Sequence, residues 1–545
     1  MKFKAINLRW DKERGLTVRP ESFDCAQESL VERWTVKPFM VRQADHERLN
    51  LKLSRLKLVA NKCIATLRAE IPDFPPSSFT MHVIICALTT ILSGCSLSKP
   101  PVHSQTVVNA LPLGTTIPPH WRSATGAKDV ANDWLKSFND TRLNALVAEA
   151  INNNLDLRQA AASVEVARQS VVVVGSQLLP RIGINLGMST IKDDDHDKWG
   201  HGNLEYAGIS WEPDIWGRLR AQTAVAQASY QATALDYAFA RQSLAATTAK
   251  SWYLTIETRQ LMGIAEQSVA IYSNLLDLVK IRRKAGKVSN LDVVEAAASV
   301  NTAQGQLREA QGLYSDARRT LEVLLGRYPA AELTVAETFT PVPPPVQGGL
   351  PSSLLERRPD LMAAESQVLA AFRSEEAAKL ALLPSFTLTL DGGRLSNGIV
   401  DILRLNPWLF RAALGVYVPV YQGGSLLAKI KIATAQQQQA IAGYGNVALT
   451  AFREVENALT SERLLAERIQ FQHSEVHDRV EAVRIAKLQY KAGSIDLLSV
   501  LQLQSYQLGS ERDLIKLHNA QLANRINLHL ALGGSFNAFP SAKTP

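Results

Sequence analysis

The sequence predicts a mainly α-helical fold with transmembrane β-strands, built from two copies of one unit. Three observations carry this prediction. The order of landmark residues repeats within the chain, each copy holds a helical stretch of about 65 residues, and short apolar runs with a period of two precede each stretch.

The internal duplication is visible in landmarks that recur at a nearly constant offset. Leu179-Pro180 returns as Leu383-Pro384, Pro213 with Gly217 as Pro419 with Gly423, Lys284-Ala285-Gly286 as Lys491-Ala492-Gly493, and Leu325-Gly326 as Leu532-Gly533. The offset drifts only from 204 to 207 residues over the whole unit. Such a conserved order and spacing indicates a duplicated unit.

These landmarks give a division of the chain. We expect a leader at 1–80, a signal segment at 81–94, a first repeat at 95–337, a linker at 338–351, a second repeat at 352–536 and a tail at 537–545. The linker contains Pro341, Pro343, Pro344 and Pro345, a composition typical of a stiff spacer.

Each copy contains a very long helix. Residues 218–281 hold one glycine and no proline, and residues 425–490 hold two glycines and no proline. At about 1.5 Å per residue, such a stretch is a rod of roughly 100 Å. This length exceeds that of ordinary globular helices and indicates a coiled-coil-like assembly.

Shorter helices are expected on either side of each long one. Residues 291–325 and 497–532 follow the two Lys-Ala-Gly turns, and residues 156–179 and 360–383 open the two copies. The opening segment and the returning helix together nearly match the length of the long helix. We therefore predict that two short helices stack end to end beside each long helix.

Period-two runs between the short and long helices predict β-strands. The apolar positions are Ile182, Ile184, Leu186 and Met188; Phe386, Leu388 and Leu390; and Trp408, Phe410, Ala412, Leu414, Val416 and Val418, with a weaker run at 204–211. Runs of about nine to eleven residues fit membrane-spanning strands. Half-buried strands of a soluble sheet are the alternative.

A lipoprotein signal favours the membrane interpretation. Leu92-Ser93-Gly94-Cys95 follows the apolar stretch 83–91, which is too short to be a transmembrane helix. Small residues before a cysteine at this place predict a covalent lipid on Cys95. The other three cysteines all precede Cys95, so zinc or cysteine-nucleophile chemistry is excluded for the chain that follows.

The first 80 residues do not fit this organisation. They carry no signal-like start and place the apolar stretch far from the first residue, so we expect translation to begin later. They also contain 15 of the 59 basic and 10 of the 51 acidic side chains, which leaves 44 and 41 from residue 81 onward. This near-balance removes the case for nucleic-acid binding.

Four strands are too few to form a closed barrel, and open sheet edges are not tolerated in lipid. If the strands span a membrane, several chains must share one barrel, and the long helices would form a second, coaxial tube. The residues themselves therefore predict a homo-oligomeric duct.

The chain from Cys95 to about residue 536 resembles the outer-membrane factors of tripartite efflux and export systems, in particular the NodT type of outer-membrane lipoprotein. The resemblance is carried by Asp133-Trp134-Leu135-Lys136-Ser137-Phe138, Asn152-Asn153-Asn154-Leu155-Asp156-Leu157, Trp211-Glu212-Pro213-Asp214-Ile215-Trp216-Gly217, Pro419-Val420-Tyr421-Gln422-Gly423-Gly424, Ala451-Phe452-Arg453-Glu454-Val455-Glu456-Asn457 and Leu530-Ala531-Leu532-Gly533-Gly534.

This resemblance implies a homotrimer, lipid-anchored in the outer membrane and extending into the periplasm. Each chain would give four strands to a twelve-stranded β-barrel, continued by a long α-helical barrel. The family is a passive duct without catalysis or cofactors. Its implied partners are a periplasmic adaptor (membrane fusion protein) and a proton-driven inner-membrane pump of the resistance-nodulation-division type.

The resemblance also assigns candidate sites near the two helix-hairpin turns. Adaptor docking is expected at Lys284, Gly286, Tyr490, Lys491 and Gly493. Asp292, Glu295 and Asp496 are candidates for a constriction ring of carboxylates, since threefold repetition would triple each one. Helix-start acids stabilised by the helix dipole are the alternative for these three. Ser499 and Gln502 stand where some relatives carry gate aspartates, which departs from the family pattern.

Other chemistry is not supported. The Asp193-Asp194-Asp195-His196-Asp197 run lacks the glycine of a calcium loop, so no metal site is predicted there. No catalytic or nucleotide-binding motif is found, and we expect no enzyme. The leading function is a duct for drugs or other small toxic compounds; the alternatives are a duct for protein secretion and a periplasmic coiled-coil scaffold.

Overall fold

A computed structural model of the chain describes residues 99–112, 114–123, 132–193, 198–346, 349–396 and 409–534. The chain divides into two units, 1–93 and 94–545, and the described residues all belong to the second. The leader, the signal segment with Cys95 and the acidic residues 194–197 lie outside the described residues.

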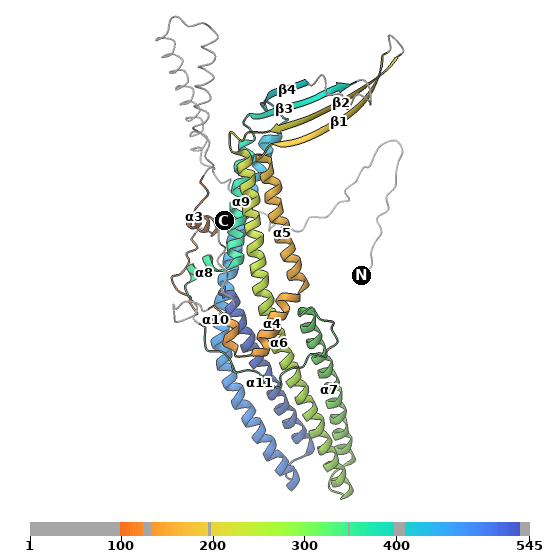
Figure 1. Cartoon of the computed structure of the whole chain (residues 1–545). Helices are drawn as coiled ribbons and strands as arrows, with labels where there is room; N and C mark the ends of the chain where they lie inside the picture. Colours follow the sequence, from red (N-terminus) through yellow and green to blue (C-terminus); the bar gives the residue numbers. More distant parts are fainter. Residues whose placement is uncertain are drawn as a thin grey trace, which may run out of the picture. The chain divides into compact units, whose positions relative to one another are not determined.

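Two long helices dominate the second unit (Figure 1). Helix α6 (Arg218–Lys284) and helix α10 (Ser425–Ala492) confirm the two predicted rods. Each turns back into a shorter helix, α7 (Asn290–Leu324) or α11 (Leu497–Ala531). Among the helices that the structure describes, none has a segment both long and apolar enough to cross a bilayer.

The opening helices of the two copies are α5 (Leu155–Gly175) and α9 (Pro359–Leu380). Helix α6 packs against both α5 and α7, and α10 packs against both α9 and α11. Asn154 before α5 donates to the Leu324 carbonyl at the end of α7, and Arg358 before α9 donates to the Ala531 carbonyl at the end of α11, which confirms the predicted end-to-end stacking. Helix α6 also packs against α9 and α11 of the other copy. The stacking was predicted from the lengths of the helical segments within each copy, which say nothing about contacts between the copies.

The strands form one antiparallel sheet in the order β1-β2-β3-β4. They are β1 (Arg181–Asp193), β2 (Lys198–Trp211), β3 (Ser385–Ser396) and β4 (Leu409–Tyr417). The Leu-Pro landmark of each copy sits where helix gives way to strand. There the indole of Trp211 donates to the Leu178 carbonyl at 3.0 Å, and that of Trp216 donates to the Pro384 carbonyl at 2.6 Å.

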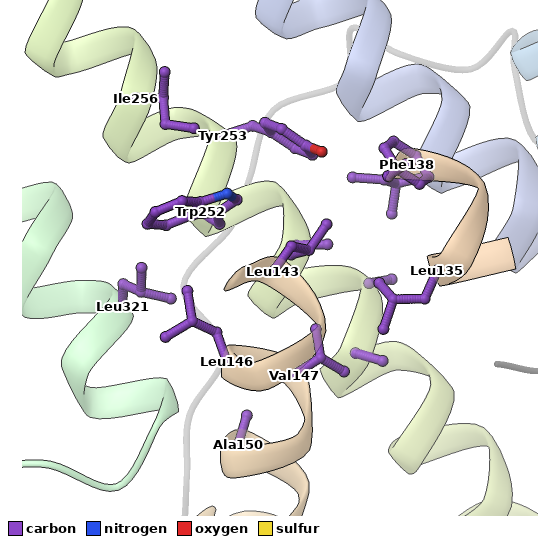
Figure 2. Close-up of a cluster of buried hydrophobic side chains, with 14 of the residues drawn as sticks. Leu135, Phe138, Leu143, Leu146, Val147, Ala150, Trp252, Tyr253, Ile256 and Leu321 are labelled. Atoms are coloured by element: carbon purple, nitrogen blue, oxygen red, sulfur yellow. The ribbon is translucent and has the colours of Figure 1, made fainter. Parts of the chain in front are cut away.

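Five short elements complete the described fold: α3 (His103–Ala110), η1 (Trp134–Phe138), α4 (Thr141–Asn153), η2 (Ser176–Leu178) and α8 (Pro351–Arg357). Helix α4 covers the middle of α6, and Figure 2 shows its Leu143 and Leu146 beside Trp252 of α6. Asp140 caps α4 through the N–H groups of Arg142 and Leu143 and also accepts the Trp252 indole at 2.9 Å.

The same position of the two copies carries different chemistry beside this core. In the first copy, Glu322 is buried and accepts the backbone N–H groups of Ala331, Glu332 and Leu333 at 2.7–2.9 Å. Burial opposes the ionisation of Glu322, but these three hydrogen bonds outweigh it and lower its pKa. The equivalent residue of the second copy, 207 positions later, is His529.

His529 is buried as a neutral ring. It stacks on Trp134 with ring centroids 5.7 Å apart, and neither ring nitrogen has a hydrogen-bond partner. Burial, with a smaller contribution from Arg525, lowers the pKa of His529 to about 4. The folded protein therefore holds this imidazole uncharged at neutral pH.

This burial predicts acid sensitivity. An unfolded histidine takes up a proton near pH 6.5, whereas His529 in the folded chain does so only near pH 4, so stability falls as the pH drops through this interval. His529→Phe keeps the aromatic stack and removes the proton. The melting temperature of the purified protein should fall less steeply from pH 7 to pH 4 in this variant than in the wild type. Equal slopes for His529→Phe, wild type and the exposed control His477→Phe would contradict the prediction.

Candidate functional site: the exposed sheet and the hairpin tips

One face of the sheet is apolar and exposed. Ile182, Ile184 and Leu186 of β1 are 76–79% exposed, and Phe410 of β4 is 82% exposed. Cross-strand register places them with Leu388, Leu390, Leu414 and Val416 on one face, opposite a face of small and polar residues. An apolar surface of this extent requires an apolar environment, because water would penalise it.

The two hairpin tips lie at the other ends of the long helices. At the first tip Gly286 has φ +71°, and its N–H donates to the Arg283 carbonyl at 3.0 Å. At the second tip Gly493 has φ +82°, and its N–H donates to the Tyr490 carbonyl at 3.0 Å. Both positions need the left-handed backbone that glycine adopts without strain. Both predicted turns are therefore present, with Lys284 and Lys491 exposed beside them.

Arg282 joins the two tips. Its Nη1 donates to the Tyr490 carbonyl at 2.7 Å, and its guanidinium carbon lies 4.5 Å from the centroid of the Tyr490 ring. The contact thus combines a charge-assisted hydrogen bond with a cation–π interaction. Arg282 is not among the residues predicted from the sequence, in which only its position in the last turn before Gly286 could have suggested it.

Tyr490 belongs to the core between the tips. It is 3% exposed and packs with Leu275, Val279 and Leu497. Burial raises the pKa of Tyr490, Arg282 opposes this shift and Asp292 adds to it. Of the candidate docking residues, Tyr490 therefore supports the tip from inside, whereas the two lysines and two glycines form its surface.

The candidate ring residues have separate local roles. Asp292 forms a capping box with Ser289 at the start of α7, and Asp496 caps α11 by accepting the Ser499 N–H at 2.8 Å. Hydrogen bonds from Ser499 lower the pKa of Asp496 below its usual range. Both acids thus perform the helix-start role that was the alternative to a ring.

Glu295 is exposed in a groove of about 860 Å³ between α6, α7 and α11. Gln502 and Tyr506 line the same groove, and the Gln502 amide donates to the Tyr506 hydroxyl at 2.8 Å. Glu295 is thus the one candidate ring residue whose carboxylate is not used in a helix cap. Within one chain the three acids thus have different local roles.

Long paired helices that join hairpin tips to a sheet with an exposed apolar face are typical of a membrane channel protein with a helical extension. The model of the outer membrane efflux protein family matches residues 146–327 and 350–534. The chain therefore belongs to this family.

Known proteins agree with this assignment. The chain is 29% identical over 473 residues to the pyoverdine export outer membrane protein OpmQ of Pseudomonas putida, covering 84% of this chain and 98% of that protein. It is 29% identical over 476 residues to the toluene efflux pump outer membrane protein TtgF of Pseudomonas putida, with 84% and 98% covered. The CmeC outer membrane channel of Campylobacter jejuni shares the fold, with a TM-score of 0.73, 19% identity and 81% and 94% of the two chains covered.

The contact of Arg282 with Tyr490 predicts how the tips can be loosened. In Arg282→Ala the hairpins lose their charged cross-link, so the distance between spin labels at Lys284→Cys and Lys491→Cys should lengthen and spread. Pulsed electron–electron distance measurements would show this change. The neighbouring, exposed Arg283→Ala is the matched control and should leave the distribution unchanged. A distance distribution in Arg282→Ala as narrow as in the wild type would show that the contact between Arg282 and Tyr490 does not hold the tips together.

Proposed function

We propose that this protein is the outer-membrane exit duct of a tripartite efflux system, through which small toxic compounds leave the cell passively. The observation that carries the proposal is the four-stranded sheet, apolar and exposed on one face, from which the long hairpins continue. The same observation, together with the family match, favours a duct over a coiled-coil scaffold.

The proposed duct is a homotrimer. The sheet of one chain has two outer strands, β1 and β4, each with one unpaired edge. In lipid, the backbone N–H and C=O groups of such edges must find partners. Three chains would join edge to edge into a closed barrel of twelve strands, a size within the range of known outer-membrane barrels.

Small molecules are the favoured cargo. Relatives of nearly equal identity are named for pyoverdine export, toluene efflux and cation efflux. Related ducts thus serve chemically different compounds, which is expected if an inner-membrane pump selects the cargo. The proposed pump is of the proton-driven resistance-nodulation-division type.

A periplasmic adaptor would dock at the hairpin tips. The tip surface contains Lys284, Lys491 and both turn glycines, and the last turn of α6 adds Arg282 and Arg283. The three cations of α6 stabilise the end of that helix through its dipole, Lys491 does the same for α10, and all four suit an acidic partner surface. Binding there would act directly on the cross-link between the tips.

The position of helix α3 supports a lipid on Cys95. Helix α3 docks on α9 and α10, with His103 Nδ1 2.8 Å from Glu365 Oε1, and Ala110 packs so closely on Gly445 that a Cβ there would lie 2.2 Å from its carbonyl oxygen. Glu365 is 15 residues before the end of α9, or about 22 Å along the helix. The eight residues from Cys95 to His103 can span about 26–29 Å. The tether can therefore reach the level of the sheet.

Lipidation has a direct test. Radioactive palmitate should be incorporated into the full chain expressed in a Gram-negative host, and Cys95→Ser should abolish this label because it removes the acylated thiol. Cys86→Ser, which changes a cysteine nine residues earlier, is the control and should retain the label. Label that persists in Cys95→Ser would exclude this anchor.

The duct function is tested by accumulation of dyes and antibiotics in a strain that lacks this chain. Expression of residues 81–545 should restore low accumulation, whereas the same segment with Gly493→Pro should not, because proline is unable to adopt the φ of +82° at this tip. Gly305→Ala, in the interior of α7 with open space around it, is the control and should restore efflux.

The outcomes separate the rival functions. Accumulation that is unchanged by loss of the chain, together with a fall in secreted protein, would assign the duct to protein export. Rescue by Gly493→Pro at the wild-type level would contradict a role of the tip in docking, while leaving the duct itself intact.

A further inference from the structure

One row across the polar face of the sheet contains a single ion pair between otherwise small residues. The register aligns Gly183 of β1, Gly208 of β2, Asp391 of β3 and Arg411 of β4. The neighbours of Arg411 along β4, Phe410 and Ala412, lie on the apolar face. Arg411 and its cross-strand partner Asp391 therefore lie on the opposite face. This is the face that would line the lumen of a closed barrel.

The geometry places the cation outermost. Nε and Nη2 of Arg411 both donate to Oδ2 of Asp391, at 3.0 and 2.5 Å. The Asp391 side chain is 13% exposed, whereas that of Arg411 is 70% exposed. The carboxylate therefore lies against the wall of the sheet, and the guanidinium group projects beyond it.

Gly208 is part of this arrangement. A Cβ added at Gly208 would lie 2.5 Å from Oδ1 of Asp391, so the carboxylate occupies the space that any side chain at this position would need. The acid is thus seated between a glycine on β2 and the arginine on β4. With Gly183 next in the row, the β1 and β2 positions of this row carry no side chain.

We propose that Arg411 forms a ring of three cations in the barrel lumen and that this ring favours the passage of anionic compounds. The inference rests on the proposed trimeric duct, since threefold symmetry puts the three copies at one level. Twelve strands about 4.8 Å apart and tilted by about 40° give a backbone radius of roughly 12 Å. At physiological salt the Debye length is about 8 Å, so the field of the ring reaches most of the lumen.

The paired carboxylate reduces this field but does not cancel it. Asp391 lies behind the guanidinium group, against the low-dielectric wall, so a solute in the lumen meets the positive end of each pair first. The N–H groups of Arg411 that do not bond Asp391 can also donate to a passing carboxylate or phosphate. Rings of arginine are the arrangement by which pores select anions.

Ion selectivity of the purified full chain in planar lipid bilayers tests the ring. The reversal potential across a KCl gradient should give an anion-to-cation permeability ratio above one. Arg411→Gln should lower this ratio by at least about threefold, because a single unit charge about 6 Å away in water already changes the concentration of one ion by about that factor. Arg411→Lys should retain the ratio, and Ala413→Ser, the next lumen-side position of β4, should not change it. An unchanged ratio in Arg411→Gln would overturn the inference.

A second measurement does not depend on conductance. In intact cells expressing the full chain, a cysteine at Ala413 should react with an anionic thiosulfonate faster, relative to a cationic one, when Arg411 is present than when it is Gln, again by at least about threefold. Arg411→Cys should be labelled and Phe410→Cys should not, because adjacent residues face opposite sides.

These outcomes keep the two proposals apart. Labelling of Phe410→Cys but not of Arg411→Cys would overturn the ring, because the arginine would then face lipid. Conductance without the Arg411 effect would overturn the ring and leave the duct. If no variant conducts ions and expression of the chain leaves accumulation unchanged, the duct itself fails, whereas the labelling still reports which face of the sheet meets water.

Discussion

The unpaired edges of β1 and β4 impose the strictest constraint on this protein. Each backbone N–H or C=O group left without a partner in hydrocarbon costs several kcal/mol, so a four-stranded sheet with an exposed apolar face has no stable place in a membrane by itself. Closing the sheet requires further chains. Once the strands are arranged around an axis, the helices that leave them are arranged around it too, and their length carries the duct away from the membrane.

The duplication supplies this geometry twice, but the two copies are not equivalent. Glu322 and His529 occupy the same place, yet one holds the chain that follows α7 by three backbone hydrogen bonds and the other fills an aromatic core as a neutral ring. Arg525 bonds Glu462 and the carbonyls of Pro343 and Pro344, and so ties the linker to α11. The junction between the copies is thus held by side chains of both copies, since the hydroxyl of Tyr253 also lies 3.0 Å from Oγ1 of Thr340 in the linker.

Sequence reasoning predicted the elements whose signal is local and repeated. The long helices were confirmed to within a few residues because uninterrupted helical sequence ends sharply at Gly286 and Gly493. The strand at 204–211 was too short in the prediction, since β2 begins at Lys198, in a stretch whose glycines and polar residues hide the alternation. Helices α3 and α8 were missed because eight and seven residues are too few to show a helical period.

The site was less predictable because its contacts join residues far apart in the chain. Arg282 and Tyr490 are 208 positions apart, and the sequence of neither hairpin indicates that it contacts the other. Asp391 and Arg411 are charges in strands of mostly uncharged residues, and a charge in such a strand is a signal that it needs a partner. Only the register of β3 against β4 pairs them.

The tips combine a strong contact with uncompensated polar groups. Nε of Arg282 and the hydroxyl of Tyr490 are buried without hydrogen-bond partners. Each such group costs about 1–3 kcal/mol, which offsets part of what the bond from Arg282 to the Tyr490 carbonyl contributes. Separation of the hairpins would let water reach both groups and recover that cost. The joined and separated tips therefore differ by less than the contact alone suggests, and a partner with modest preference for the separated state is sufficient to shift the balance between them.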